Sequence, residues 1–330
     1  MGRASRDTGK YLKYGIIALS VVFLISAGLL LLEIWEKGQG NFPQTEQEES
    51  TVEYEGQKYV LKDGIETLLV LGLDKYDGAV TSDSYNNDQQ ADFLMLFVFD
   101  NIEKKYTAIQ INRDTVAEVN VLGVAGNKID TVSQQIALAH TYGNGKDLSC
   151  RNTADAVSAL LRGVKVNHYV SMKMDSVIVL NDLVGGVTVT VLDDFTGIDD
   201  TLVQGETVTL MGEQALRYVR TRQGLEDSSN ASRMERQQQY VKALRESFKT
   251  CVEEDDEFVV EASLEMADYL ITDRSVTQLQ EISRKMDEYK FGGILDIEGT
   301  NKVGEDFMEF SVDEKAVEKL VIEQFYELKK

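Results

Sequence analysis

The stretch FLMLFVFDNIEKKYTAIQIN, residues 93 to 112, holds two apolar segments separated by a short polar one. Both segments, 93–99 and 106–112, are almost continuous runs of apolar or β-branched residues, and 67–73 (TLLVLGL) is a third such run. Runs of this kind are typical of strands that are buried on both faces of a sheet. The sequence therefore predicts a sheet whose central strands are covered on both sides.

Helical patterns lie between and after these strands, where apolar residues recur at three- and four-residue spacing. The segments with this pattern are 133–143, 153–164, 174–186, 212–222, 232–248, two segments in the tail and about 313–328. Thr153 is the expected N-cap of the second helix, and further strands are expected at 168–173 and 187–192. Strands that alternate with helices predict an α/β fold, here an α-β-α sandwich with a central mixed sheet.

The N-terminal region contains YGIIALSVVFLISAGLLLL, residues 14 to 32, which has no charged residue and is long enough to cross a bilayer as a helix. Four basic residues precede it and two glutamates follow it, so the positive-inside rule places the N-terminus in the cytoplasm. A cleaved signal peptide is the alternative, but its apolar core would be shorter. We expect a cytoplasmic tail at 1–13, a single transmembrane signal anchor at 14–35, an extracellular tether at 36–60 and one domain at 61–330.

Composition and charge narrow the classes of ligand. A formal net charge of -22 argues against broad electrostatic binding of nucleic acid, so an anionic ligand must be met by a local cluster of cations. On the exported side, Cys150 and Cys251 are compatible with a disulfide and equally with two unrelated buried thiols.

Several kinds of chemistry have little support in the sequence. Only two histidines are present, and there is no H-E-x-x-H motif, cysteine cluster or G-x-S-x-G motif. Asn230-Ala231-Ser232 fits the pattern of a glycosylation acceptor, which is common by chance. Carboxylates and arginines remain as the candidate functional groups.

The densest cluster of cations is VRTRQGLEDSSNASRMERQQQ, residues 219 to 239, which contains four arginines and no lysine. Arg217 and Arg220 share one helical face, and Arg233, Arg236 and Gln237 share a face of the next helix. Arginine binds phosphate or carboxylate through a planar fork, so the cluster predicts an anion site. The alternative is a set of surface ion pairs with the neighbouring acidic residues, which are Glu213, Glu226, Asp227 and Glu235.

Carboxylates are expected near this cluster. Asp74 ends one buried strand, the pair Arg113-Asp114 ends another, and Asp92 begins a third. Ligands of open α/β sheets collect at the carboxyl ends of strands. A pair of carboxylates beside several arginines suits a magnesium-bound diphosphate. Turn and strand-capping roles for these aspartates are the alternative.

Together these residues resemble the LytR-CpsA-Psr family of bacterial cell-envelope proteins, most strongly over about residues 65–245. The motifs that carry the resemblance are LLVLGLD (68–74), ADFLMLFVFD (91–100), INRDT (111–115), YGNG (142–145), NHYVSMKMDSVIVLNDLVGGV (167–187) and GEQALRYVRTRQGLEDSSNASRMERQQQ (212–239). The resemblance implies a membrane-anchored phosphotransferase of a Gram-positive-type envelope. Such an enzyme takes a glycan polymer from a polyprenyl-diphosphate carrier and attaches it to peptidoglycan through a phosphodiester bond.

The resemblance also implies roles for individual residues. Asp74 and Asp92 match the aspartates that hold Mg²⁺, the expected cofactor. The residues that match the diphosphate clamp are Arg113, Arg220, Arg222, Arg233 and Gln237, and those expected to be catalytic are Asp92, Arg113, Arg220 and Arg222. Asp227 lies in the loop where the family often has an acidic residue. The family's apolar lipid cavity would be lined by segments such as 133–142 and 174–184.

Three positions depart from the family pattern, and the first two lie close to the expected diphosphate site. Gln90 stands where the family commonly has arginine, Gln135 where it has lysine, and Asn112 where it has proline. The loss of positive charge leaves open a second class of function, a non-catalytic polyprenyl-phosphate receptor or regulator of the envelope. A third class, a purely structural envelope protein, would bind neither lipid nor magnesium.

Overall fold

The computed structural model describes residues 51–75, 87–222, 224–225, 230–255, 257–304 and 308–329. The predicted tail, anchor and most of the tether, and also Asp227, lie outside these residues. Among the helices of the described residues, none combines the length and the apolar character that crossing a membrane requires. The strands β1 (Val52–Tyr54) and β2 (Gln57–Leu61) fall within the segment predicted as a tether, so the folded domain begins earlier than expected, at about Val52.

A six-stranded sheet forms the centre of the domain, in the order β11-β8-β3-β4-β5-β12. Its strands are β3 (Ile65–Lys75), β4 (Gln89–Asp100), β5 (Lys105–Ile111), β8 (His168–Lys173), β11 (Leu270–Thr272) and β12 (Lys290–Asp296). Strand β4 runs antiparallel to β3 and β5, whereas β8 and β12 run parallel to their neighbours β3 and β5. The mixed sheet is as predicted. The carboxyl ends of β3 and β5 therefore meet the amino end of β4 at one edge.

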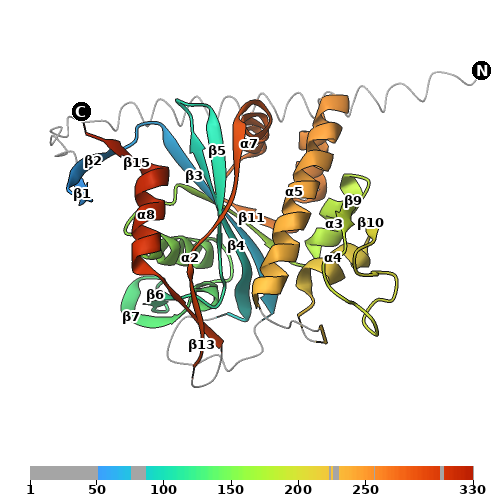
Figure 1. The fold of residues 1–330 in the computed structure, drawn as a ribbon, viewed down its shortest axis with the longest axis horizontal. Coiled ribbons are helices and arrows are strands. Elements are labelled where there is room, and N and C mark those ends of the chain that lie inside the picture. The colour runs from blue at the N-terminus through green and yellow to red at the C-terminus, as the bar shows by residue number, and fades with distance from the viewer. Residues whose placement is uncertain are drawn as a thin grey trace, which may run out of the picture. The chain divides into compact units, whose positions relative to one another are not determined.

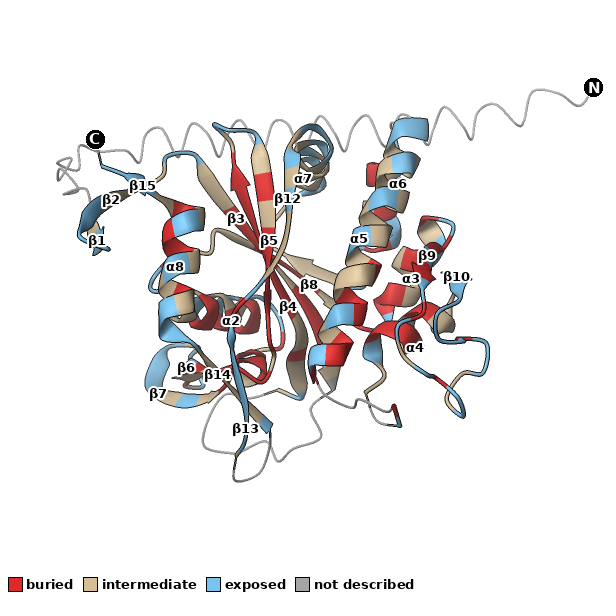
Figure 2. Ribbon diagram, in the orientation of Figure 1, coloured by how far each residue is buried: buried red, intermediate tan, exposed pale blue. Residues whose placement is uncertain are grey.

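Helices cover both faces of this sheet (Figure 1). On one face, alternate strand residues such as Leu69 and Leu71 join a core with α2 (Asp147–Leu160) and α8 (Glu314–Phe325). On the other face, Leu68 and Met95 belong to a core that contains Ile282 of α7 (Val276–Glu288) and packs against α5 (Asn230–Glu254). Buried residues are concentrated along the central strands (Figure 2). The sandwich architecture is therefore confirmed.

The remaining elements surround these layers. They are the hairpins β6 (Val116–Leu122)–β7 (Lys128–Gln135) and β13 (Gly299–Val303)–β14 (Met308–Val312), the pair β9 (Val187–Thr190) and β10 (Thr207–Leu210), the 3-10 helix η1 (Ile136–Thr141), the helices α3 (Ser176–Leu183), α4 (Glu213–Arg220) and α6 (Phe258–Glu265), and β15 (Tyr326–Leu328). A third core joins α3, α4 and β9 to the side of α5. Because α4 and α5 pack on each other there, Arg220 at the end of α4 and Arg233 near the start of α5 lie at the same end of the sheet, where they contact Asp74 and Asp92.

Several local predictions differ from the structure. The segment 133–143 is not a regular helix, because β7 continues to Gln135 through its pairing with β6 and only a 3-10 helix follows. Thr153 is not an N-cap: α2 begins at Asp147, and the Thr153 hydroxyl donates to the carbonyl of Ser149 within the helix. The tail contains the short strands β11 to β15 as well as the predicted helices, and its last helix ends at Phe325.

Candidate active site

The position of Asp92 depends on a β-bulge. The register of β3 and β4 passes from the pair Gly72–Phe93 directly to the pair Leu73–Ala91, so Asp92 is the extra residue. Ala91 packs in the core beneath α2, whereas Phe93 faces α5. A bulge re-aims a side chain relative to simple alternation. Here it directs the Asp92 carboxylate toward α5, and the strand begins at Gln89 rather than at Asp92 as predicted.

Two arginines from distant segments converge on Asp92. Nη1 of Arg113, from the segment that follows β5, donates to Asp92 Oδ1, and Nη1 of Arg233 on α5 lies 3.5 Å from Asp92 Oδ2. Burial raises the pKa of the Asp92 carboxyl, whereas the two arginines lower it, and the nearby carboxylates Asp74 and Asp114 raise it. Burial also lowers the pKa of Arg233 to about 10, against the opposing effect of Asp92. Arg233 is therefore a cation at neutral pH.

Arg113 is held by protein groups on all sides of its guanidinium. Its Nη2 donates to Gln90 Oε1 at 3.1 Å, and its Nε lies 3.3 Å from Asp114 Oδ1. Gln135 in turn donates from Nε2 to Asp114 Oδ1 at 3.1 Å and to the carbonyl of Met308 at 2.6 Å. Both glutamines that replace charged residues of the family pattern therefore contact the Arg113–Asp114 pair directly.

The second carboxylate, Asp74, lies near the end of β3. Arg220, the last residue of α4, contacts it through a two-pronged ion pair in which Nε–Oδ2 and Nη2–Oδ1 are both 2.7 Å. The Arg220 side chain is 47% exposed, so a ligand can reach it from solvent. Arg222 lies two residues beyond the end of α4, close enough to Arg233 to lower the pKa of that group. Within the described residues, Arg222 has no ion pair with a carboxylate.

Two arginines of the segment serve the fold instead. Arg236 is fully buried, donates from Nη1 to the carbonyl of Tyr218 at 2.8 Å and pairs through Nε with Asp193 at 2.9 Å. Its guanidinium also lies 5.4 Å from the ring centre of Phe195. Arg217 forms ion pairs with Asp199 and Glu213. The ion-pair interpretation is therefore correct for Arg217. The other four arginines, Arg113, Arg220, Arg222 and Arg233, lie around Asp74 and Asp92, and we call them the arginine cluster.

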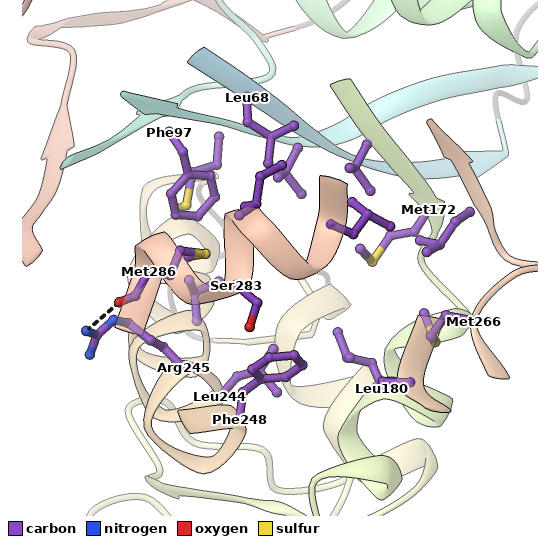
Figure 3. Close-up of a pocket in the computed structure, with 18 of the residues that line it drawn as sticks. Leu68, Phe97, Met172, Leu180, Leu244, Arg245, Phe248, Met266, Ser283 and Met286 are labelled. Atoms are coloured by element: carbon purple, nitrogen blue, oxygen red, sulfur yellow. Dashed lines mark hydrogen bonds between the residues drawn. The ribbon is translucent and has the colours of Figure 1, made fainter. Parts of the chain in front are cut away.

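An apolar cavity of about 370 Å³ lies between the sheet and the helices α5 and α7. Figure 3 shows Leu68 and Phe97 of the sheet on one side of it and Leu244 and Phe248 of α5 on another. The residues of the predicted segment 174–184 that line the cavity are Met174, Val177 and Leu180. The predicted segment 133–142 does not line it. Its residues Ile136 and Ala139 pack on the opposite face of the sheet, with α2.

The cavity ends beside the polar cluster. Gln237 lines the cavity, and its buried amide donates to the carbonyl of Val219 at 3.3 Å. Met174 lines both the cavity and an adjoining polar depression that contains Asp74. Gly72 allows close packing at this junction, because a Cβ there would lie 2.7 Å from the sulfur of Met174. The arrangement suits an amphiphile with a long apolar chain and an anionic head.

If Asp74 and Asp92 hold a metal ion, its other ligands must come mainly from a substrate and water. Among the described residues, no group of three or more histidine, cysteine, aspartate or glutamate side chains is placed to hold a metal. Asp74 lies near enough to Asp92 for its charge to raise the pKa of the Asp92 carboxyl. Mg²⁺ is usually bound by one or two carboxylates together with substrate phosphates and water, which is compatible with this pair.

The two cysteines contribute nothing to this site. Both thiols are free, and Cys150 is buried beside His140 and Ser171 on the far face of the sheet. The two thiols are therefore unrelated, but only Cys150 is buried as that alternative expected, because Cys251 is partly exposed.

Comparison with known proteins agrees with the fold and the motifs. The model of the LytR_cpsA_psr family matches residues 35–325. The polyisoprenyl-teichoic acid–peptidoglycan teichoic acid transferase TagU of Bacillus licheniformis is 25% identical over 251 residues, which cover 74% of this chain and 72% of TagU. Biofilm regulatory protein A of Streptococcus mutans is 24% identical over 221 residues, which cover 65% of this chain and 51% of that protein.

Solved structures share the fold. TagT bound to LIIa-WTA superimposes with a TM-score of 0.59 and 23% identity, covering 79% of this chain and 90% of TagT. TagV of B. subtilis gives a TM-score of 0.59 and 22% identity, covering 80% of this chain and 98% of TagV.

Proposed function

The chain belongs to the LytR-CpsA-Psr family, and from this premise we propose that it is a membrane-anchored phosphotransferase. It takes a glycan polymer from a polyprenyl-diphosphate carrier and attaches it to peptidoglycan through a phosphodiester bond. The observation that carries the proposal is the apolar cavity that ends beside four arginines and two carboxylates. The name of TagU as a teichoic acid transferase and the teichoic acid bound to TagT support it.

Each part of the carrier has a counterpart in the structure. The polyprenyl chain occupies the cavity between the sheet and α5, where burial of its apolar surface favours binding. The diphosphate lies at the end of the cavity, where Arg220 and Arg222 reach it from the solvent side and Arg113 and Arg233 from beneath. Residues 14–35 anchor the chain in the membrane with the domain outside the cell, beside both the lipid carrier and peptidoglycan.

The charge at the site favours a bound cation. Arg113, Arg220, Arg222 and Arg233 together with Asp74, Asp92 and Asp114 leave a formal charge of only +1. A diphosphate diester is a dianion, so the protein alone does not neutralise it. Asp74 and Asp92 would hold Mg²⁺, which supplies further neutralisation of phosphate charge when it is bound.

The chain's own residues account for most of the transfer step. A sugar hydroxyl of peptidoglycan forms a new bond to the glycan-side phosphorus, while that phosphorus loses its bond to the bridging oxygen and polyprenyl phosphate leaves. The arginines stabilise the charge that develops on the phosphate oxygens. Asp92 is the candidate acceptor of the hydroxyl proton, because burial raises the pKa of its carboxyl.

The test uses the full-length protein in detergent with a polyprenyl-diphosphate-linked glycan and peptidoglycan fragments, in magnesium or in chelator, with products read by mass spectrometry. Arg222→Ala should lower transfer by about 100-fold or more. It should leave the melting temperature unchanged, because Arg222 has no carboxylate partner among the described residues. Arg217→Ala is the matched control, since Arg217 pairs with Asp199 away from the site.

The outcomes separate the classes of function. Magnesium-dependent transfer that is lost in Arg222→Ala supports the enzyme. Bound lipid without any product would identify a receptor in which Gln90 and Gln135 have replaced the charges needed for turnover. If the wild-type protein neither binds lipid nor forms product, the site is wrongly assigned.

A further inference from the structure

Two asparagines join segments that are far apart in the sequence. Asn112 follows β5, and Asn230 is the first residue of α5. Nδ2 of Asn230 donates to Oδ1 of Asn112 at 2.6 Å, across a separation of 118 residues. The same Oδ1 also accepts the backbone N–H of Asp114 at 3.0 Å. Both asparagine side chains are buried, so this contact lies inside the domain rather than on its surface.

The asparagine pair closes a ring of contacts that includes Arg113 and Arg233 of the arginine cluster. Oδ1 of Asn230 accepts a hydrogen bond from Nη2 of Arg233, and Arg233 faces Asp92 through Nη1. The ring continues from Asp92 through Arg113 and Asp114 back to Asn112. It consists of Asp92, Arg113, Asp114, Asn112, Asn230 and Arg233. Two arginines that come from opposite halves of the chain therefore share one closed network.

The chemistry of the amide explains why asparagine suits position 230. Its side chain donates to Asn112 and accepts from Arg233 at the same time, which an ionised aspartate cannot do because it has no donor. The amide also adds no charge to a cluster in which carboxylates and guanidiniums are nearly balanced. Because both polar atoms of Asn230 are used and its side chain is buried, the Asn230-Ala231-Ser232 pattern is not an accessible glycan acceptor in the folded domain.

We propose that Asn112 and Asn230 are positioning residues that fix Arg233 of α5 against the Arg113 segment, so that both guanidiniums converge beside Asp92. Arg233 has one fixed contact on each side of its guanidinium, Asn230 and Asp92. When the asparagine bridge is removed, the first turn of α5 loses its bond to the end of β5, and Arg233 gains freedom to move. The effect of this positioning on ligand binding rests on the proposed function, whereas the positioning of Arg233 by the two asparagines does not depend on it.

The experiment combines a binding measurement with one that needs no ligand. Full-length wild type, Asn112→Ala, Asn230→Ala and the double variant are titrated in detergent with geranylgeranyl diphosphate and Mg²⁺. The exposure of Arg233 is followed in parallel by its modification with phenylglyoxal, mapped by mass spectrometry. Asn152→Ala is the matched control: Asn152 is equally buried and donates two hydrogen bonds, to the carbonyls of Asn120 and Ala139, on the other face of the sheet.

Each single variant should bind the probe about tenfold more weakly, and the double variant should lose about the same tenfold rather than a hundredfold, because both changes remove one coupled contact. Arg233 should be protected from phenylglyoxal in the wild type and in Asn152→Ala, and reactive in the other variants. The positioning role would be refuted if folded variants kept wild-type affinity and a protected Arg233. It would also be refuted if the double variant bound the probe about a hundredfold more weakly, because the two asparagines would then act independently. If Arg233 becomes reactive as expected but even the wild type binds no probe, the positioning role stands and the proposed function fails.

Discussion

Replacement of Arg236 by methionine should strongly destabilise the domain without removing any contact of the arginine cluster. The Arg236 guanidinium is fully buried and is bonded to the carbonyls of Tyr218 and Thr221, at the end of α4. It also pairs with Asp193 and lies against the ring of Phe195. Methionine has a similar length and fills most of the space, so the effect reports the lost charge and hydrogen bonds rather than a large cavity.

The magnitude follows from the partners that are left behind. Removing one member of a buried ion pair costs about 3 to 5 kcal/mol, and we expect about 4 kcal/mol because Asp193 keeps the hydroxyl of Ser232 as a partner. For a domain of this size, each kcal/mol lowers the melting temperature by roughly 2 to 4 °C, so a decrease of about 8 to 16 °C is expected.

The assay is thermal and urea unfolding of the full-length protein in detergent, followed by circular dichroism. Arg217→Met provides the matched control, since Arg217 also belongs to this region, on α4, but its own side chain is 39% exposed in its ion pair with Asp199. That change should cost only about 0 to 1 kcal/mol. A loss below about 1 kcal/mol in Arg236→Met, or equal losses in the two variants, would refute the assignment of Arg236 as a buried structural cation.

Three further predictions concern groups outside the arginines. Burial raises the pKa of the Cys150 thiol to about 11. Iodoacetamide at pH 8 should therefore alkylate the partly exposed Cys251 and spare Cys150 until the protein unfolds. An intact protein mass that shows a disulfide between the two residues would contradict this. Burial lowers the pKa of His140 from 6.5 to about 4, so its neutral ring favours folding above pH 6.5 and this contribution disappears as the pH falls toward 4. Urea unfolding at pH 7 and pH 4.5 should show that His140→Asn loses less stability on acidification than the wild type, by about 2 kcal/mol. Equal losses would count against a buried neutral ring. Gly72→Val should lower the free energy of unfolding by about 1 to 3 kcal/mol and weaken the binding of geranylgeranyl diphosphate, because the added Cβ would lie 2.7 Å from a methionine sulfur that lines the cavity. Binding is measured by calorimetry. Unchanged binding would mean that the apolar chain of the probe does not occupy this cavity.

The central strands and the family were predictable from local sequence. The continuous apolar runs correspond to β3, β4 and β5, because strands covered on both faces have no polar side to interrupt them. The motifs that contain Asp74, Asp92 and Arg113 also indicated the family, and these residues do lie at one edge of the sheet.

The tail and the cavity lining were predicted less well. The strands β11, β13 and β14 are only three to five residues long, so they carry too short a pattern to read, and each pairs with a partner strand. The segment 133–142 is apolar enough to line a cavity, but its pattern does not specify which face of the sheet it covers. That choice depends on the β6–β7 hairpin, which places the segment beneath α2.

The fold class, the family and the presence of arginines and aspartates as candidate site residues could thus be predicted without a structure, because hydrophobic periodicity and residue type are local properties of the sequence. Which arginines lie beside Asp74 and Asp92 depends on the tertiary structure. Arg233 and Arg236 are three residues apart on one helix, yet one faces Asp92 and the other faces Asp193. The bulge at Asp92 and the bond between Asn112 and Asn230 likewise depend on strand register and on contacts between segments remote in the chain. The direction of a side chain is set by what packs around it, and those neighbours are brought together only by folding.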